Sequence, residues 1–323
     1  MTDGSGDCSG STLAFAEFLR ESGIRVVWAY REDPAQVPAG FRGVRAGTAR
    51  HRWIAARSRW WLTDGLPMRV SGPDTVGRPL ERGNGTVVVA FTEPSVERVG
   101  SDLVDWPLFT PRRQRLIQIR GEADVDLVVT PCDGVGEQQA RALGIAAPVT
   151  IGSPLADRVP DRAAARAALG LAQEGPVVGV VSARGQDALI LGWLAGLEGV
   201  ALVSAGEGGR PAEVVGACDV LVTDTSGWGA VAARRGRPVV ICAPDLRDLL
   251  SRGPGLYLPW QRDLPGPWAG DPAALHGAIE QVRDAGWMVP EPYRVGHAAL
   301  AALAGSGSSG ACAELLSTLE ARA

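Results

Sequence analysis

The sequence contains no lysine, and all of its 32 basic residues are arginine. This absence excludes catalysis through a lysine Schiff base, and it excludes the lysine-containing P-loop as a phosphate site. The net formal charge is −4, so no overall basic field indicates a nucleic-acid partner, and we expect none.

Cysteine and histidine are also scarce, with five cysteines and three histidines among 323 residues. No two cysteines form a C-x-x-C pair, and the histidines are scattered along the chain. Neither a disulfide framework nor a zinc site is therefore supported, and we expect no bound metal or cofactor. Cys218 and Cys242 lie among apolar residues, and we expect them in the core.

Long apolar runs are missing as well. No run approaches the roughly 18–20 residues that a membrane-spanning helix needs, and residues 1–11 lack the charged-then-apolar pattern of a signal peptide. The chain is 46% hydrophobic with a mean hydropathy near zero, which is typical of soluble globular proteins. We expect a cytoplasmic protein, and peripheral contact with the inner face of the membrane stays open.

Short apolar runs alternate with helical patterns through both halves of the chain, which predicts an α/β fold. One stretch shows the pattern most clearly. Asp219–Val222 reads as a buried strand, Thr223–Gly227 as a turn and Trp228–Arg235 as a helix, and a second apolar run begins at Val239. Such a β-turn-α-turn-β unit implies a parallel sheet.

The turn in this unit carries three side chains of the types that begin helices: Asp224, Thr225 and Ser226. Free N–H groups and the positive end of the helix dipole favour a phosphate at such a turn. The alternative is that these residues only cap the helix, since many α/β units bind nothing at this position.

Four pieces of the second half, in this order and spacing, resemble the C-terminal signature of the CDP-glycerol glycerophosphotransferases, the family of teichoic-acid polymerases and primases. They are Thr223–Gly227, Arg237-Pro238 followed by Ala243–Leu246, Arg252–Tyr257, and Asp263–Pro267. Trp60–Asp64 and Asp126–Pro131 resemble stretches from the first half of the family. The resemblance extends over residues 8–319.

This resemblance implies the GT-B fold, in which two Rossmann-like domains face each other across a cleft. We expect an acceptor-side domain at residues 1–151 and a nucleotide-binding domain at residues 152–323. The last helix, Ala311–Arg322, could pack back on the first domain. The family moves glycerol phosphate from CDP-glycerol to a hydroxyl of a polyol-phosphate chain, which implies a nucleotide-activated donor and a polyol-phosphate or glycan acceptor.

The chain departs from the family at both of its functional histidines. The family motif W-H-G-T-P, whose histidine is thought to be the catalytic base, corresponds here to Phe91–Ser95, with Thr92 at the histidine position. The second histidine is missing from Ser204–Gly208. A threonine hydroxyl does not titrate near neutral pH, so it cannot replace imidazole as a base. The candidate catalytic residues are therefore Glu93, as the base, and Thr92 beside it.

The candidate residues for binding the nucleotide and its phosphates come from three places, the first of which is the Thr223–Gly227 turn. The resemblance contributes Arg184, after the strand Val177–Val181, and a Gly/Ser stretch at Gly305–Gly310, which reads either as an anion cradle or as a flexible linker. The full set is Arg184, Thr223, Asp224, Thr225, Ser226, Gly227, Ser308 and Ser309.

Three functions remain open at this point. The first is a diverged transferase that moves a polyol-phosphate group from a CDP-activated donor to a hydroxyl acceptor. The second is a non-catalytic homologue that binds a nucleotide, a polymer or a protein partner, suggested by the loss of both histidines. The third is a GT-B glycosyltransferase that uses a nucleotide sugar, because the fold does not fix the donor.

Overall fold

The computed structural model describes residues 10–30, 33–64, 86–92, 94, 96–98, 102, 125–142, 148–206, 210–244, 246, 255–305 and 310–322. Packing divides the chain into two compact units. Unit 1 comprises Met1–Glu93, Thr110–Asp157 and Gly307–Ala323, and unit 2 comprises Pro94–Phe109 and Arg158–Ser306. Each unit therefore contains a segment that is distant in sequence from the rest of it.

Unit 1 is built on four parallel strands in the order β3-β4-β5-β6. They are β3 (Trp60–Asp64), β4 (Val87–Phe91), β5 (Leu127–Thr130) and β6 (Pro148–Thr150). β1 (Val27–Tyr30) and β2 (Arg42–Arg45) form a separate parallel pair. The central strands β4 and β5 are apolar along almost their whole length because both of their faces are covered.

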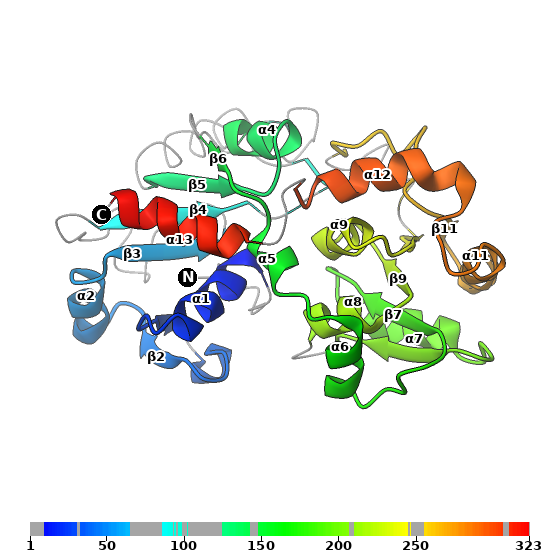
Figure 1. The fold of residues 1–323 in the computed structure, drawn as a ribbon, viewed down its shortest axis with the longest axis horizontal. Coiled ribbons are helices and arrows are strands. Elements are labelled where there is room, and N and C mark those ends of the chain that lie inside the picture. The colour runs from blue at the N-terminus through cyan, green and yellow to red at the C-terminus, as the bar shows by residue number, and fades with distance from the viewer. Residues whose placement is uncertain are drawn as a thin grey trace. The chain divides into compact units, whose positions relative to one another are not determined.

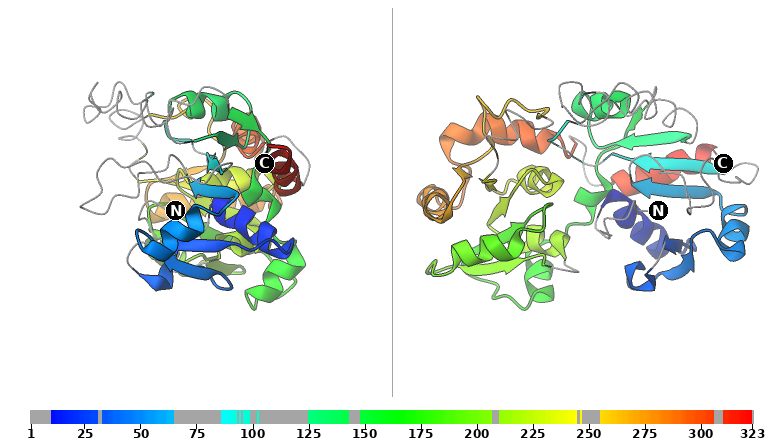
Figure 2. Two further views of the ribbon diagram at one scale, coloured as in Figure 1. Left: turned by 90° about the vertical axis from the view of Figure 1, so that its left-hand side faces the viewer. Right: turned by 180° about the vertical axis from the view of Figure 1, so that it is seen from behind.

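Helices cover the two faces of the sheet in unit 1 (Figure 1). They are α1 (Ser11–Glu21), α4 (Val135–Ala142) and α13 (Ala311–Arg322), whereas α2 (Ala49–Ala55) lies beside β2 and α5 (Pro154–Asp157) beside α1; a 3₁₀ turn lies at Pro34–Gln36. Phe15 of α1 and Leu315 of α13 pack with Val89 and Phe91 of β4 in one core cluster. Figure 2 shows the strands of this sheet from the opposite side, with α13 behind them.

The start of α13 is held by a carboxylate of the same unit. Asp157 Oδ2 accepts hydrogen bonds from the backbone N–H groups of Gly310, at 3.2 Å, and Cys312, at 3.1 Å. A carboxylate stabilises the positive end of a helix in this position. The Gly310 N–H, at the end of the expected Gly/Ser anion cradle, is therefore already occupied, and Ser308 and Ser309 themselves lie outside the described residues.

Unit 2 contains a five-stranded parallel sheet in the order β11-β10-β9-β7-β8. The strands are β7 (Val177–Val181), β8 (Ala201–Ser204), β9 (Val220–Thr223), β10 (Val239–Cys242) and β11 (Trp268–Ala269). The β9-turn-helix-β10 unit predicted from the sequence is present, and β9 and β10 pair in parallel as expected.

The helices of unit 2 are α6 (Arg162–Ala168), α7 (Asp187–Leu194), α8 (Pro211–Ala217), α9 (Gly227–Arg234), α11 (Pro272–Asp284) and α12 (Arg294–Ala302), with a 3₁₀ turn at Glu291–Tyr293. Ile190 of α7 and Ile279 of α11 share a core cluster with the strands. Gly179 of β7 faces Val214 and Cys218, because a Cβ at this position would lie 2.9 Å from each of them.

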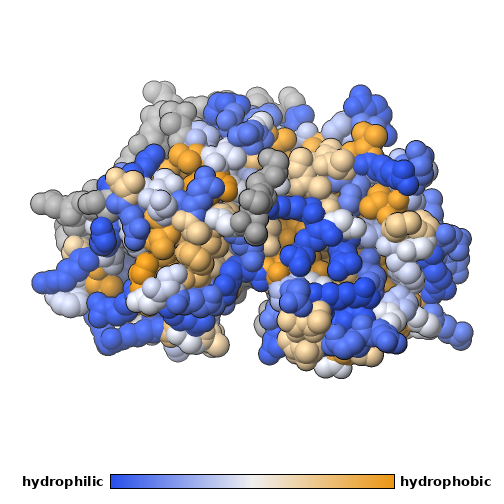
Figure 3. All heavy atoms as spheres, in the orientation of Figure 1, coloured by the Kyte–Doolittle hydropathy of each residue, from blue (hydrophilic) through white to orange (hydrophobic). Residues whose placement is uncertain are grey.

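Cys218 and Cys242 are fully buried free thiols, which confirms the prediction that they belong to the core. No helix in the described part of the chain is long and apolar enough to cross a membrane. Figure 3 shows hydrophilic side chains over much of the face in view, with the hydrophobic ones in smaller groups between them.

Candidate functional site

The turn between β9 and α9 is the centre of the candidate site, and it lies at the carboxyl end of β9, where ligands of parallel sheets commonly bind. Ser226 is the N-cap residue of α9, and its Oγ accepts a hydrogen bond from the Trp228 N–H at 3.3 Å. Thr223, the last residue of β9, is fully buried, and its hydroxyl has no hydrogen-bond partner among the described residues. The helix begins at Gly227, one residue before the predicted start at Trp228, and its N-cap is one of the three predicted capping residues.

Asp224 connects this turn to the loop that follows β7. Its carboxylate accepts hydrogen bonds from the Ser182 hydroxyl at 2.7 Å and from the backbone N–H groups of Ala183 and Arg184, each at 3.2 Å. It also accepts from the Ser226 N–H at 2.9 Å, and the residue is 2% exposed. Because its oxygens are taken up by these donors, Asp224 holds two loops in register, and a contact with a phosphate stays a prediction.

The loop after β7 contains a second acidic residue. Asp187, at the first position of α7, accepts a hydrogen bond from the Ser182 N–H at 2.8 Å. Burial raises the pKa of Asp187, and the neighbouring charge of Asp224 adds to the effect. The loop that carries Arg184 is thus held by two carboxylates, that of Asp187 at the start of α7 and that of Asp224 in the turn before α9.

Arg184 and Thr225 point their donors at one carboxylate, that of Glu97. The Arg184 Nη2 atom lies 3.1 Å from Glu97 Oε1, and the Thr225 hydroxyl donates to the same oxygen. The Arg184 and Glu97 side chains are 31% and 30% exposed. An anionic group is therefore already bound by two of the residues predicted to hold a phosphate, and it remains accessible to solvent.

Glu97 is kept in place by short backbone pairing. It forms an antiparallel bridge with Leu256, the Arg98 N–H donates to Gly255 at 3.0 Å, and the Tyr257 N–H donates to Val96 at 2.8 Å. The Tyr257 hydroxyl also donates to Asp102 Oδ2 at 3.0 Å. These bonds hold the part of the chain around Glu97 within unit 2.

Gly227 brings this segment close to the start of α9. A Cβ at position 227 would clash with the carbonyl oxygen of Pro94. Glycine is needed here because of the close approach of another backbone, a role that its position in a turn alone did not predict.

Glu97 is the member of this candidate site that the sequence analysis missed. It lies four positions after Glu93 in the same stretch, so the only sequence signal was a second carboxylate following β4. Glu93 itself lies outside the described residues. The Thr92 N–H and hydroxyl both approach the Val129 carbonyl, at 3.0 and 3.3 Å, so Thr92 fastens β4 to β5. Catalytic roles for Glu93 and Thr92 stay predictions.

The three histidines are each engaged with backbone groups. His276 Nε2 lies 2.7 Å from the Trp193 carbonyl, and His297 Nε2 lies 2.8 Å from the Arg237 carbonyl. His51 Nδ1 accepts from the Gly47 N–H at 3.4 Å. Burial lowers the pKa of His51 and of His297. Within the described residues, no group of three His, Cys, Asp or Glu side chains could hold a metal ion.

No protein-family model and no curated protein sequence matches the chain. Solved structures do match it. The wall teichoic acid polymerase TagF aligns with a TM-score of 0.75 at 16% identity, covering 99% of this chain and 87% of TagF. A TagF variant soaked with CDPG gives 0.75 at 17% identity, covering 100% and 87%.

A putative UDP-N-acetylglucosamine 2-epimerase from Listeria monocytogenes aligns with a TM-score of 0.51 at 10% identity, covering 99% of this chain and 95% of the epimerase. At such identities, these likenesses establish the fold. The predicted α/β fold of the GT-B class, with two Rossmann-like units, is confirmed, and the resemblance to the teichoic-acid polymerase family holds at the level of the fold.

Proposed function

We propose that this protein is a transferase that moves a polyol-phosphate group from a CDP-activated donor to a hydroxyl acceptor. The observation that carries the proposal is the group formed by Arg184, Thr225 and Glu97 at the β9–α9 turn. Two donors there already bind an anionic oxygen, and they do so on the fold of TagF, of which one structure was soaked with CDPG.

The donor diphosphate would take the place of the Glu97 carboxylate. A diphosphate offers oxygens that accept from Arg184 and Thr225, and a guanidinium binds phosphate oxygens strongly. Two anions cannot share these donors without repulsion, so binding of the donor would release the Glu97 side chain. Arg184 would then offset the negative charge on the diphosphate during the reaction.

The reaction itself requires a base and a leaving group. The acceptor oxygen attacks the β-phosphorus, the bond from this phosphorus to the bridging oxygen breaks, and CMP leaves with the electron pair. The proton of the acceptor hydroxyl passes to a carboxylate of the chain. Glu93 is the first candidate for this base, and the released Glu97 is the second, because both follow β4 in one short stretch.

A non-catalytic homologue is the second candidate function. This function is favoured by Thr92, which stands at the position of the family's histidine and cannot act as a base. Its hydroxyl donates a hydrogen bond to the Val129 carbonyl of β5. In that case, Glu97 would stay on Arg184, and the protein would act by binding a polymer or a protein partner.

The test is thermal unfolding with CDP-glycerol, CDP, CMP, UDP-GlcNAc or no ligand. A ligand at about 100 times its dissociation constant adds roughly 2.7 kcal/mol to the native state, which shifts the midpoint by several degrees. We expect a shift with the cytidine diphosphates that Arg184→Gln reduces and that Arg262→Gln, at an arginine with a 79% exposed side chain, leaves intact. A shift with UDP-GlcNAc alone would favour the nucleotide-sugar alternative.

Turnover separates the remaining alternatives. Release of CMP from CDP-glycerol in the presence of a polyol acceptor would eliminate the non-catalytic reading. Undiminished release by Glu93→Gln would remove Glu93 as the base and leave Glu97 to be tested in the same assay.

A further inference from the structure

A second group of arginines lies at the other end of the same sheet in unit 2. Pro176 and Asp219 immediately precede β7 and β9, and Arg237 lies two residues before β10, so the three residues mark the amino ends of neighbouring parallel strands. The candidate phosphate turn follows the carboxyl end of β9. Together with Arg162 and Trp287, these residues line a hollow of about 390 Å³, which is within the size range of small-molecule sites.

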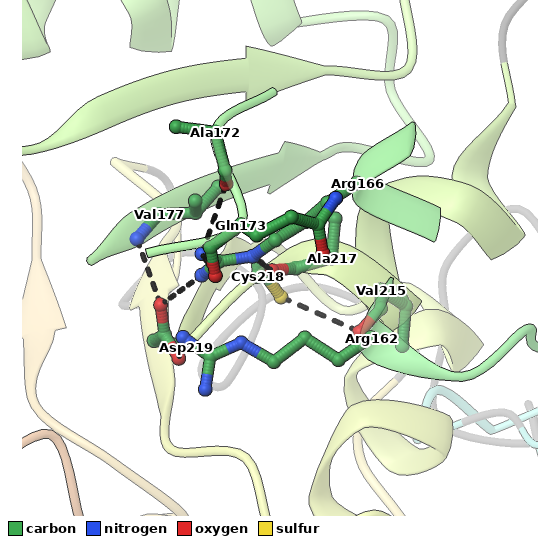
Figure 4. Close-up of polar contacts among 9 residues, drawn as sticks. All are labelled: Arg162, Arg166, Ala172, Gln173, Val177, Val215, Ala217, Cys218 and Asp219. Carbon is green, nitrogen blue, oxygen red and sulfur yellow. Dashed lines mark hydrogen bonds and ion pairs between the residues drawn. The ribbon is translucent and has the colours of Figure 1, made fainter. Parts of the chain in front are cut away.

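Asp219 is the ionic partner of two arginines near this hollow, Arg162 and Arg166. Its Oδ2 lies 2.8 Å from Nη2 of the fully buried Arg166 and accepts from the Val177 N–H at 2.8 Å. Its Oδ1 lies 2.9 Å from Nη2 of Arg162. Figure 4 shows the carboxylate of Asp219 between these two guanidinium groups. The single negative charge of Asp219 is therefore shared by two guanidinium groups.

Arg166 is fully committed to the protein. Besides its ion pair, Nε donates to the Ala217 carbonyl at 3.2 Å, and Nη1 donates to the carbonyls of Ala172 and Gln173 at 3.2 and 2.8 Å (Figure 4). With four of its five N–H groups bonded and its side chain fully buried, this guanidinium belongs to the core and is not available to a ligand. The charges that face the hollow are those of Arg162, Asp219 and Arg237.

Arg237 is not satisfied. Its Nε is buried without a hydrogen-bond partner, and its guanidinium forms no ion pair with any residue that the structure describes. A buried N–H of a charged group that is left unbonded is costly, and native proteins rarely leave one without a reason. Burial lowers the pKa of the neighbouring Arg235, and the positive charge of Arg237 lowers it further. Several cations therefore lie together at this end of the strands.

Trp287 forms the aromatic wall of the hollow, in an uncommon backbone conformation. Its φ is +60°, the only positive φ of a non-glycine residue in the described ranges. A bulky residue in this region is strained, and such strain gathers at ligand-binding sites. The Arg283 guanidinium lies 5.9 Å from the centre of the indole ring. The indole is partly buried and packs against the core cluster of the sheet, so it offers a fixed flat surface.

We infer that this hollow binds a small organic oxyanion, a phosphate or carboxylate carried on a planar ring, with the Arg237 guanidinium as its main ionic partner. Arg162 supplies a second cation, and Trp287 supplies the surface against which the ring stacks. The anion binds the terminal nitrogens of Arg237, whose guanidinium has no ion-pair partner among the described residues. This inference is independent of the proposed transferase activity, because it concerns the opposite edge of the sheet.

The experiment is calorimetric titration of the full chain with phenyl phosphate, with inorganic phosphate and phenol as the two partial probes. We expect phenyl phosphate to bind more tightly than either probe. Arg237→Met should weaken it at least tenfold, whereas Trp287→Leu should weaken phenyl phosphate and leave inorganic phosphate unchanged. Arg262→Gln, at an exposed arginine outside both groups, should bind phenyl phosphate as the natural chain does.

A second measurement locates the ligand without relying on the arginine variants. The chain labelled with 5-fluorotryptophan gives a resonance for Trp287 that Trp287→Phe identifies, and phenyl phosphate should move it. The inference is overturned if phenyl phosphate does not bind at millimolar concentration, if Arg237→Met binds it unchanged, or if the Trp287 resonance stays in place at saturation.

Discussion

Replacing Glu97 by glutamine should make the protein bind cytidine diphosphates more tightly. The Glu97 carboxylate accepts from Arg184, at 3.1 Å, and from the Thr225 hydroxyl, which are the donors that we assign to the donor diphosphate. Glutamine keeps the length of the side chain and removes its charge, so the variant no longer competes for the guanidinium.

The structure limits the size of this gain. The two side chains of the Arg184–Glu97 pair are 31% and 30% exposed, so water and salt screen the pair. Pairs of this kind contribute at most about 1 kcal/mol, which corresponds to a gain of up to roughly fivefold in affinity. Arg184→Gln removes a charge-assisted hydrogen bond to the ligand of about 1.5–3 kcal/mol, which should weaken binding roughly ten- to hundredfold.

The assay is calorimetric titration with CDP at fixed ionic strength, with Arg262→Gln as the control for an exposed arginine. The double variant is the decisive sample, because in the Arg184→Gln background Glu97 has lost the guanidinium for which it competes. Glu97→Gln should therefore add little there, a non-additive result. Equal or weaker binding of CDP by the single variant Glu97→Gln would refute the assignment of the two donors to the diphosphate.

Three further changes test the framework around the sites. Arg166→Met should lower the free energy of unfolding by about 3–5 kcal/mol, measured with urea, because it leaves the Asp219 carboxylate buried and short of a partner. Gly227→Ala should lower it by about 1–3 kcal/mol, because the new Cβ overlaps the Pro94 carbonyl; an unchanged urea midpoint would contradict that close approach. Burial holds the pKa of His297 below its ordinary value of 6.5, so as the pH falls below about 6.5 the unfolded chain takes up the proton first and stability declines. His297→Gln should lose less stability than the natural chain between pH 7 and 5, and parallel curves would show that this histidine titrates equally in both states.

The sequence predicts best those elements whose own residues determine them. β7 was expected at Val177–Val181, and the structure has it there, because a strand covered on both faces is a continuous apolar run. β2, at Arg42–Arg45, carries arginine at both ends and forms only because β1 lies beside it. A strand of that kind has no periodicity from which to predict it.

The candidate site divides in the same way. The Thr223–Gly227 turn was predictable because N-cap residues and the following helix are adjacent in sequence. Glu97 was not predictable, because its contact with Thr225 depends on the route that the chain takes after β4 and on the pairing of Glu97 with Leu256. The same holds for Arg237, whose unbonded Nε becomes visible only when the surroundings of the side chain are known.

The return of α13 to unit 1 has a consequence for the order in which the chain can fold during its synthesis. Ala311, Cys312, Leu315 and Leu319 belong to the same core cluster as Phe15 of α1. The ribosome makes these four residues after it has completed all of unit 2. The core of the unit that begins first therefore closes last, and until then the side chains of β4 and β5 that pack against α13 lack this cover.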